Sequence, residues 1–286
     1  MKTVQQSYPE LAAAFGVPEV YLKREDQHKY GSHKGRSIPL MIKKYAKEGH
    51  ANFVISSSGN AALAAIYAVR AHNYNNPQAI KLTVYIGKNI NPEKLKIILA
   101  VIDDANIKLE QVDKPKQKAF QVDKKEGIKM LRQSTDDTAL EGYFELADEL
   151  SKIPNLQAVF IPTSSGTTAQ GLGEAFAKLK INPQIHIVQT TACHPIADEI
   201  RDKRYEIQDT NQSIADAIVD KIAHRKEKVL EIIKNSHGSG WIADDEEIKD
   251  AIKLVEDACN ILISPNSALS IVGLKKAVEN GFRGEK

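Results

Sequence analysis

The chain has 286 residues, room for about two domains, and its 42% hydrophobic and 27% charged residues are typical of a soluble globular protein. Its longest apolar run, residues 61–69, is far shorter than the roughly 20 residues that a membrane-spanning helix needs. With 39 Lys and Arg against 37 Asp and Glu, the formal net charge is only +2, too small to attract nucleic acid or an anionic membrane. We therefore expect neither partner.

Cysteine and histidine usage gives no sign of a disulfide framework or a metal centre. The two cysteines, Cys193 and Cys259, are too few for a disulfide framework and lack the spacing of a zinc site. The histidines include no pair one helical turn apart, so we expect no metal. No charged and then apolar leader follows Met1, which favours a reduced, cytoplasmic protein.

Short apolar runs alternate with helical patterns along most of the chain, which predicts an α/β fold with parallel strands. In the first half we expect strands at 19–25, 51–58, 82–87 and 106–112, and helices at 38–48, 61–71 and 92–102. Lysines and arginines gather within 108–132, but acidic residues lie among them, so this stretch is interpreted as a solvated helical face.

A second series follows the polar stretch 133–138. Here the pattern predicts helices at 141–151, 169–180, 248–258 and 268–279, and strands at 158–162 and 185–190. The two series suggest two lobes.

The first segment that suggests chemistry is GSHKGR, residues 31–36, where a strand end turns through Gly31 into a helix near Lys34. The positive end of a helix disfavours an ammonium group and so favours the neutral amine that a Schiff-base lysine needs. Taken alone, Lys34 is also compatible with a solvated surface lysine.

The second segment is SSGN, residues 57–60, which joins a strand to a helix. Backbone N–H groups and hydroxyls of such a turn face the carboxyl edge of the sheet, where a carboxylate can bind. The alternative is that Ser58 and Asn60 only cap the helix.

The third segment is SSGTT, residues 164–168, again between a strand and a helix. Its hydroxyls and the helix N-terminus suit a phosphate monoester. It lacks the lysine of a Walker loop, so a nucleoside triphosphate is not expected. Helix capping alone is the alternative.

In this order, the three segments resemble the fold-type II pyridoxal 5'-phosphate (PLP) enzymes, which include threonine synthase, threonine/serine dehydratase, cysteine synthase and the tryptophan synthase β subunit. The resemblance implies PLP as cofactor, an amino acid as small-molecule substrate and a homodimer. It also implies two domains, each a mostly parallel twisted sheet flanked by helices. These are a large cofactor-binding domain, 1–35 and 136–286, and a smaller substrate-side domain, 36–135.

The resemblance assigns roles residue by residue. Lys34 forms the Schiff base, and Asn60 hydrogen-bonds the phenolate oxygen of the cofactor. The cofactor phosphate is bound by Ser164, Ser165, Gly166, Thr167 and Thr168. The substrate carboxylate is bound by Ser57, Ser58 and Gly59. Candidates for binding a substrate phosphate are Lys29, His33 and Arg36.

Four further segments are most similar to threonine synthase: 139–142 (ALEG), 189–196 (QTTACHPI), 213–216 (SIAD) and 264–268 (SPNSA). This implies a lyase that converts O-phosphohomoserine to threonine and phosphate, with Lys34 as the base. A serine/threonine dehydratase, a cysteine synthase-like enzyme and a non-catalytic PLP-binding module remain as alternatives.

Two features depart from the family pattern. Gly35 stands where threonine synthases commonly have Asp, and the sequence ends at Lys286 without the last strand of its relatives. Ser267, with Asn266 next, is therefore the candidate partner of the pyridine nitrogen. We expect a partner protomer to cover the unpaired sheet edge, or the fold to be weakened.

Overall fold

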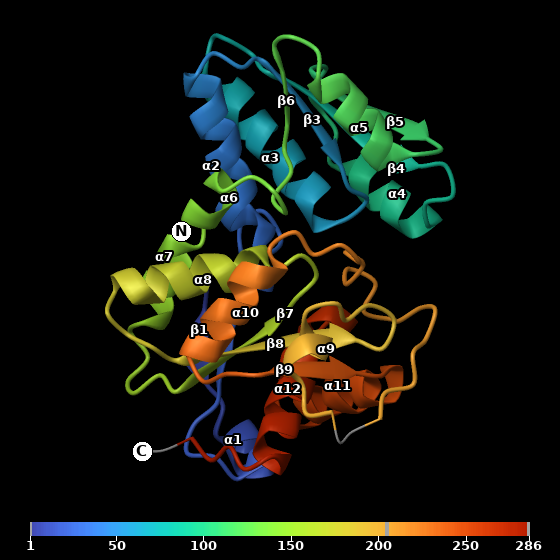
Figure 1. Ribbon diagram of the computed structural model, residues 1–286. Coiled ribbons are helices and arrows are strands. Elements are labelled where there is room, and N and C mark those ends of the chain that lie inside the picture. The colour runs from blue at the N-terminus through green and yellow to red at the C-terminus, as the bar shows by residue number, and fades with distance from the viewer. Residues whose placement is uncertain (1, 204–205, 285–286) are drawn as a thin grey trace. The chain divides into compact units, whose positions relative to one another are not determined.

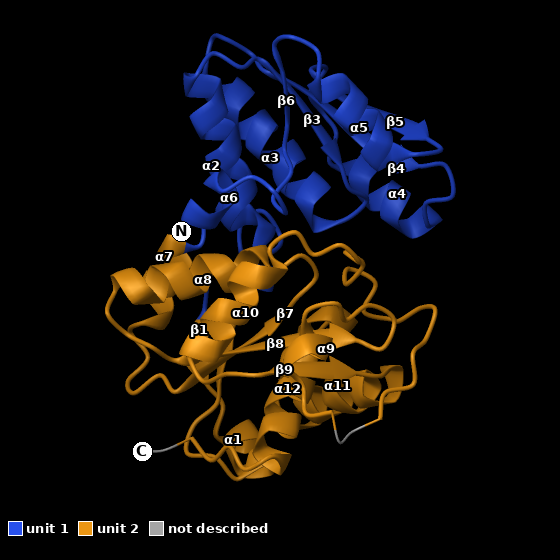
Figure 2. Ribbon diagram, in the orientation of Figure 1, with its two compact units in different colours: residues 1–4, 24–143 blue, residues 5–23, 144–286 orange. Residues whose placement is uncertain are grey.

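The computed structural model describes residues 2–203 and 206–284 and divides into two compact units (Figures 1 and 2). Unit 1 comprises residues 1–4 and 24–143, and unit 2 comprises residues 5–23 and 144–286. In the described part of the chain, no helix is long and apolar enough to cross a membrane. The assignment of cofactor and substrate to a large and a small domain stays a prediction.

Unit 1 is built on a four-stranded parallel sheet with the order β5-β4-β3-β6. Its strands are β3 (Asn52–Ser56), β4 (Lys81–Gly87), β5 (Ile107–Val112) and β6 (Ile128–Met130). The first three lie where the sequence predicts strands. β6 was not predicted, because three residues are too few to show an alternating pattern.

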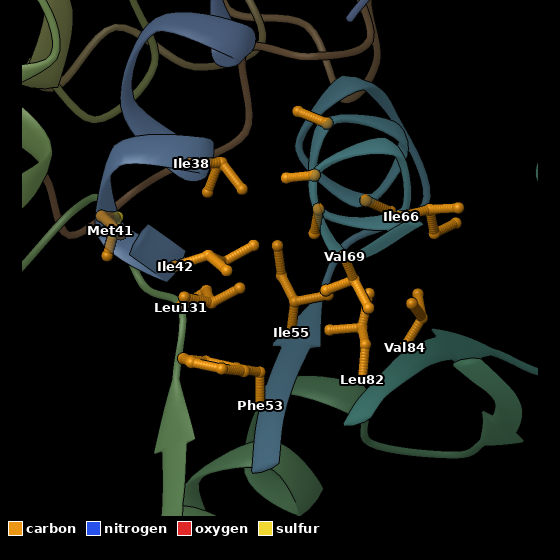
Figure 3. Close-up of a cluster of buried hydrophobic side chains, with 14 of the residues drawn as sticks. Ile38, Met41, Ile42, Phe53, Ile55, Ile66, Val69, Leu82, Val84 and Leu131 are labelled. Atoms are coloured by element: carbon orange, nitrogen blue, oxygen red, sulfur yellow. The ribbon is translucent and has the colours of Figure 1, made fainter. Parts of the chain in front are cut away.

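Alternate side chains of these strands pack on opposite faces of the sheet, as the pleat requires. Phe53 and Ile55 of β3 pack with Leu82 of β4 into one core, which includes residues of α2 and α3 (Figure 3). Val54 and Tyr85 face the other way and pack with Ala119 of α5. The helical elements of unit 1 are η1 (Glu25–Gln27), α2 (Lys34–Lys47), α3 (Asn60–Asn75), α4 (Pro92–Ala100), α5 (Pro115–Asp123) and α6 (Thr138–Glu141).

Unit 2 contains a parallel sheet with the order β7-β8-β9. Its strands are β7 (Ala158–Pro162), β8 (Gln184–Thr190) and β9 (Gly240–Ala243). Its helices are α1 (Pro9–Phe15), α7 (Phe144–Leu150), α8 (Thr167–Lys178), α9 (Ala197–Ile200), α10 (Lys226–Asn235), α11 (Asp245–Cys259) and α12 (Pro265–Glu279). The α12 helix contacts all three strands, and its Leu269 and Val272 share a core with Val188 of β8.

The prediction of an α/β fold with parallel sheets flanked by helices is therefore confirmed. One expected element was wrong. The strand predicted at 19–25 does not begin the parallel series, because β2 (Tyr21–Lys23) pairs antiparallel with β1 (Gln5–Ser7) in a separate two-stranded sheet. In the described part of the chain, the edge strands of the unit 2 sheet are β7 and β9, and the covering of an unpaired edge by a second protomer stays a prediction.

Candidate functional site

Lys34 is the first residue of α2, as the sequence predicts for the cofactor lysine. The Ser32 hydroxyl accepts the backbone N–H of Lys34 at 3.3 Å and so closes the turn before the helix. The Lys34 side chain is half-buried. Its amine has no ion pair or hydrogen bond with any residue that the structure describes. The amine is therefore available for a ligand.

The chain path brings Lys34 and the SSGN loop to the same edge of the unit 1 sheet. The α2 helix ends five residues before β3 begins, so its N-terminus lies toward the far, carboxyl end of that strand. The α3 helix begins four residues after β3 ends, and α2 and α3 pack against each other. Both helix N-termini therefore lie at the carboxyl edge, where α/β proteins bind ligands.

Arg36 anchors the first turn of α2. Its buried guanidinium donates to the Glu25 carboxylate at 2.8 and 3.0 Å and to the Thr3 hydroxyl at 3.2 Å. The hypothesis that Arg36 binds a substrate phosphate is wrong, because Glu25 already neutralises its charge and binds both Nε and Nη2. Two hydrogen bonds of this kind instead hold α2 to η1.

Gly35 is explained by its neighbour His28. A Cβ atom at position 35 would lie 2.2 Å from His28 Nδ1 and 2.9 Å from Tyr30 Cβ, distances that no side chain tolerates. The buried His28 ring accepts the Tyr30 backbone N–H at 3.2 Å. Gly35, which stands where threonine synthases commonly have Asp, therefore leaves room for the His28 ring against the start of α2.

His33, the N-cap residue of α2, is uncharged at neutral pH. Burial lowers the pKa of His33 to about 3, and the neighbouring Lys34 charge adds to this effect. Its ring lies 6.4 Å from the Tyr143 ring, centroid to centroid. His33 can therefore offer a neutral imidazole beside the lysine.

The ALEG segment, residues 139–142, packs against the same helix turn. A Cβ at Gly142 would lie 2.4 Å from the Arg36 carbonyl oxygen and 2.5 Å from Ser37 Cα, so only glycine permits this approach. The Ser37 hydroxyl is buried and also hydrogen-bonds the Tyr143 hydroxyl at 3.4 Å. This packing explains in physical terms why a glycine occupies the segment.

The SSGN loop leaves the N-terminus of α3 without a side-chain cap. The N-cap residue is Gly59, and the Ser57 hydroxyl accepts its backbone N–H at 3.2 Å. Asn60 is exposed at the first helical position. The alternative that Ser58 and Asn60 serve as caps is therefore wrong, and the helix end can accept an anion.

The SSGTT loop of unit 2 likewise leads into a helix without a side-chain cap. Gly166 is the N-cap of α8 at a φ of 90°, a conformation that favours glycine, and no side chain caps the helix. A Cβ there would also lie 2.8 Å from Val229 Cγ2. The Ser165 and Thr167 hydroxyls lie 3.0 Å apart and bond to each other. Capping alone therefore does not account for these hydroxyls.

Ser164 and Asn266 both hold the segment 217–220. The Ser164 hydroxyl oxygen accepts the backbone N–H groups of Val219 and Asp220 at 3.0 and 3.1 Å, which leaves its own proton for another acceptor. The Asn266 side chain accepts the N–H of Ala217 at 3.0 Å. Beside it, the exposed Ser267 hydroxyl lies 3.0 Å from that of Ser264, the N-cap residue of α12.

Gln189, on β8, is a positioning residue that the sequence reasoning missed. It is fully buried, and its Nε2 donates to the carbonyl oxygens of Thr163 and Ser164 at 3.2 and 3.5 Å. Its Oε1 accepts the N–H groups of Ile196 and Ala197 at 2.9 and 2.8 Å. One side chain thus holds the loop backbone, a role that the sequence analysis did not assign to Gln189 although it begins the segment 189–196.

Each unit thus has a strand, a loop of small polar residues and a helix without a side-chain cap, and unit 1 also has a lysine amine with no partner among the described residues. The chain belongs to the family described as "Pyridoxal-phosphate dependent enzyme", whose model matches residues 2–286. It is therefore a PLP-dependent enzyme of fold type II.

Among curated proteins, the chain is 27% identical to a threonine synthase of Methanocaldococcus jannaschii, over 95% of this chain and 68% of that protein. It is 23% identical to an L-threonine ammonia-lyase of Thermotoga maritima, over 94% of this chain and 65% of that protein. Among solved structures, a fungal L-serine ammonia-lyase from Rhizomucor miehei has a TM-score of 0.81 and 17% identity, covering 100% of this chain and 91% of that one. The last comparison shows the fold alone.

The residues present suit PLP. An uncapped helix N-terminus that carries hydroxyl groups binds a phosphate, and an unpartnered lysine amine can bond to the cofactor carbonyl carbon. The protein supplies both, with Thr167 and Lys34 as their central residues.

Proposed function

We propose that the protein is a PLP-dependent lyase of the threonine synthase type, which converts O-phosphohomoserine to threonine and inorganic phosphate. The observation that carries the proposal is the unpartnered Lys34 amine at the N-terminus of α2, at the same sheet edge as the uncapped SSGN loop. The similarity to threonine synthases along nearly the whole chain supports the choice of substrate.

The cofactor, when bound, supplies an electron sink for the bonds broken at the substrate. In this proposal Lys34 holds the cofactor through its amine, and Asn60 donates a hydrogen bond to the cofactor ring oxygen. The phosphate is held by Ser164, Ser165, Gly166, Thr167 and Thr168. Ser267 would offer its hydroxyl to the pyridine nitrogen.

The substrate is oriented by the other loop. Ser57, Ser58 and Gly59 offer hydroxyl and N–H donors at the start of α3, where the helix dipole favours the substrate carboxylate. Neutral His33 donates one hydrogen bond near the lysine, and exposed Lys29 supplies positive charge for the substrate phosphate.

Lys34 also moves the proton. The Lys34 amine would take the proton from the substrate α-carbon as a general base. Loss of phosphate and addition of water then complete the conversion to threonine.

The proposal predicts that PLP-loaded protein releases phosphate from O-phosphohomoserine with equimolar threonine, measured by a phosphate assay and amino-acid analysis. Lys34→Ala is expected to lower kcat by at least about 1,000-fold, because it removes the proton-transfer group. Lys29→Ala, which retains the base, serves as the matched control and is expected to raise KM more than it lowers kcat. Absence of phosphate release from the loaded wild type would contradict the threonine synthase assignment.

A serine/threonine dehydratase is the second candidate. A 51-residue stretch of the chain is 51% identical to human L-serine dehydratase/L-threonine deaminase. Release of a 2-oxo acid from serine or threonine, without phosphate release from O-phosphohomoserine, selects this candidate. Formation of cysteine from O-acetylserine and sulfide selects a cysteine synthase-like enzyme, and PLP binding with no turnover selects the non-catalytic module.

A further inference from the structure

A groove with a volume of about 530 Å³ lies in unit 1, on the face of the sheet against which α5 packs. Its charged lining consists of four lysines and one carboxylate, Lys81, Lys108, Lys118, Lys125 and Glu110. We call this feature the lysine groove. Its lining has a net charge of +3, although the whole chain has a net charge of only +2.

The four lysines reach the groove from two walls. Lys81 of β4 and Lys108 of β5 extend from the same face of the sheet, because Lys108 pairs in register with Thr83, two residues after Lys81. On the other wall, Lys118 lies in α5 and Lys125 lies in the turn that follows this helix, and Val122 between them in sequence packs against the sheet. The positive charges therefore converge on one space.

None of the four lysines forms an ion pair with a residue in the described ranges, 2–203 and 206–284. Two other lysines of the same unit do form ion pairs: Lys88 pairs with Asp113 at 3.0 Å, and Lys44 pairs with Glu141 at 3.3 Å. Unneutralised like charges around one cavity repel each other, and a bound anion removes that repulsion.

The groove is separate from the cofactor lysine and the SSGN loop. Val54 and Tyr85 line it on the face of the sheet against which α5 packs. The helices α2 and α3, which begin at Lys34 and at the end of the SSGN loop, pack against the opposite face, with Phe53 and Ile55. The groove and the predicted substrate site are therefore separated by the sheet.

We propose that the lysine groove binds a small anion with two adjacent phosphoryl groups. Two phosphoryl groups carry about −3 to −4 at neutral pH, which balances the charge of the lining. Lysine ammonium groups bind phosphate as point charges, and the volume is that of a small-molecule site. This site is additional to the proposed catalytic function.

The test is a calorimetric titration of PLP-saturated protein with inorganic pyrophosphate at low ionic strength. PLP occupies its own phosphate site beforehand, so pyrophosphate does not compete there. We expect saturable binding to one site and at least about ten-fold weaker binding by the double variant Lys108→Gln/Lys118→Gln. The matched control Lys116→Gln/Lys124→Gln removes the same charge from the same region outside the groove, and we expect its Kd to change by less than about two-fold.

The outcomes distinguish this proposal from the proposed function. Absence of saturable binding by the wild type, or an equal loss in both double variants, would overturn the groove proposal. The visible absorbance of bound PLP is recorded for each variant, and we expect it to be unchanged, which also shows that the variants fold. If neither the wild type nor any variant binds PLP, the catalytic proposal fails. The groove proposal is still tested, by comparing the pyrophosphate affinity of Lys108→Gln/Lys118→Gln with that of Lys116→Gln/Lys124→Gln.

Discussion

At the scale of single residues, two glycines determine how closely the chain can pack around the first turn of α2, which begins at Lys34. Gly35 leaves room for the His28 ring, and Gly142 lets the end of α6 touch the backbone of α2. Neither glycine has a positive φ, so space, and not backbone conformation, is the reason for glycine at both positions.

Gly142→Ala is expected to lower the free energy of unfolding by about 3 kcal/mol, because the new methyl group overlaps backbone atoms that cannot move aside cheaply. The measurement is urea denaturation monitored by circular dichroism. Gly87→Ala is the control, since a Cβ at Gly87 meets no atom within 4 Å. A loss no greater than that of the control would show that α6 and α2 are not packed as described.

His186 makes stability depend on pH. Its Nδ1 accepts the Trp241 indole N–H at 3.2 Å, its Nε2 lies 3.0 Å from Gln184, and burial lowers the pKa of His186 to about 4. Between pH 6.5 and 4 the unfolded chain binds a proton at this ring and the folded chain does not, so stability falls as the pH falls through this window.

We therefore expect His186 to account for a loss of about 2 kcal/mol of unfolding free energy between pH 7 and pH 5. The comparison is urea denaturation of the wild type and His186→Gln at both values. His186→Gln keeps a polar group but no longer titrates. Its unfolding free energy is therefore expected to fall by about 2 kcal/mol less than that of the wild type between the two pH values. Equal drops in the two proteins would mean that the folded ring is protonated at pH 5.

At the scale of elements, Gln189 connects the start of the SSGTT loop to the start of α9. Its four hydrogen bonds fix the carbonyl groups of Thr163 and Ser164 and the N–H groups of Ile196 and Ala197. It acts through the loop and does not itself contact the cofactor in this account.

Gln189→Met is expected to weaken PLP binding by at least about ten-fold, because buried carbonyl and N–H groups lose their partners. The readouts are PLP titration by absorbance and the free energy of unfolding. Gln157→Met, an exposed change just before β7, is the control. Gln189→Glu keeps the acceptor and is expected to restore part of the affinity; a stability loss with unchanged PLP affinity would exclude the positioning role.

The elements also show what sequence can predict. Strands such as β4 and β8 were predicted because their apolar runs are long enough to stand out. The pairing of β2 was not predicted, since the sequence of its partner β1, Gln-Gln-Ser, shows no strand pattern. Likewise, the pairing of Arg36 with Glu25 and Thr3 depends on tertiary contacts across up to 33 residues, which no local pattern reveals.

At the scale of the whole molecule, both units use the same device: a parallel strand ends in a loop of small polar residues, and an uncapped helix follows. In unit 1 this is β3, the SSGN loop and α3, and in unit 2 it is β7, the SSGTT loop and α8. Such a device is visible in sequence because the strand, the Ser/Gly loop and the helix are contiguous. The roles of the individual site residues toward PLP stay predictions.

The visible absorbance spectrum of the purified protein with PLP tests most directly whether Lys34 holds PLP. We expect a yellow band in the wild type that is lost on borohydride reduction, absent in Lys34→Ala and retained in the control Lys29→Ala. A colourless wild type, or the same band in Lys34→Ala, would contradict the assignment of Lys34 as the cofactor lysine.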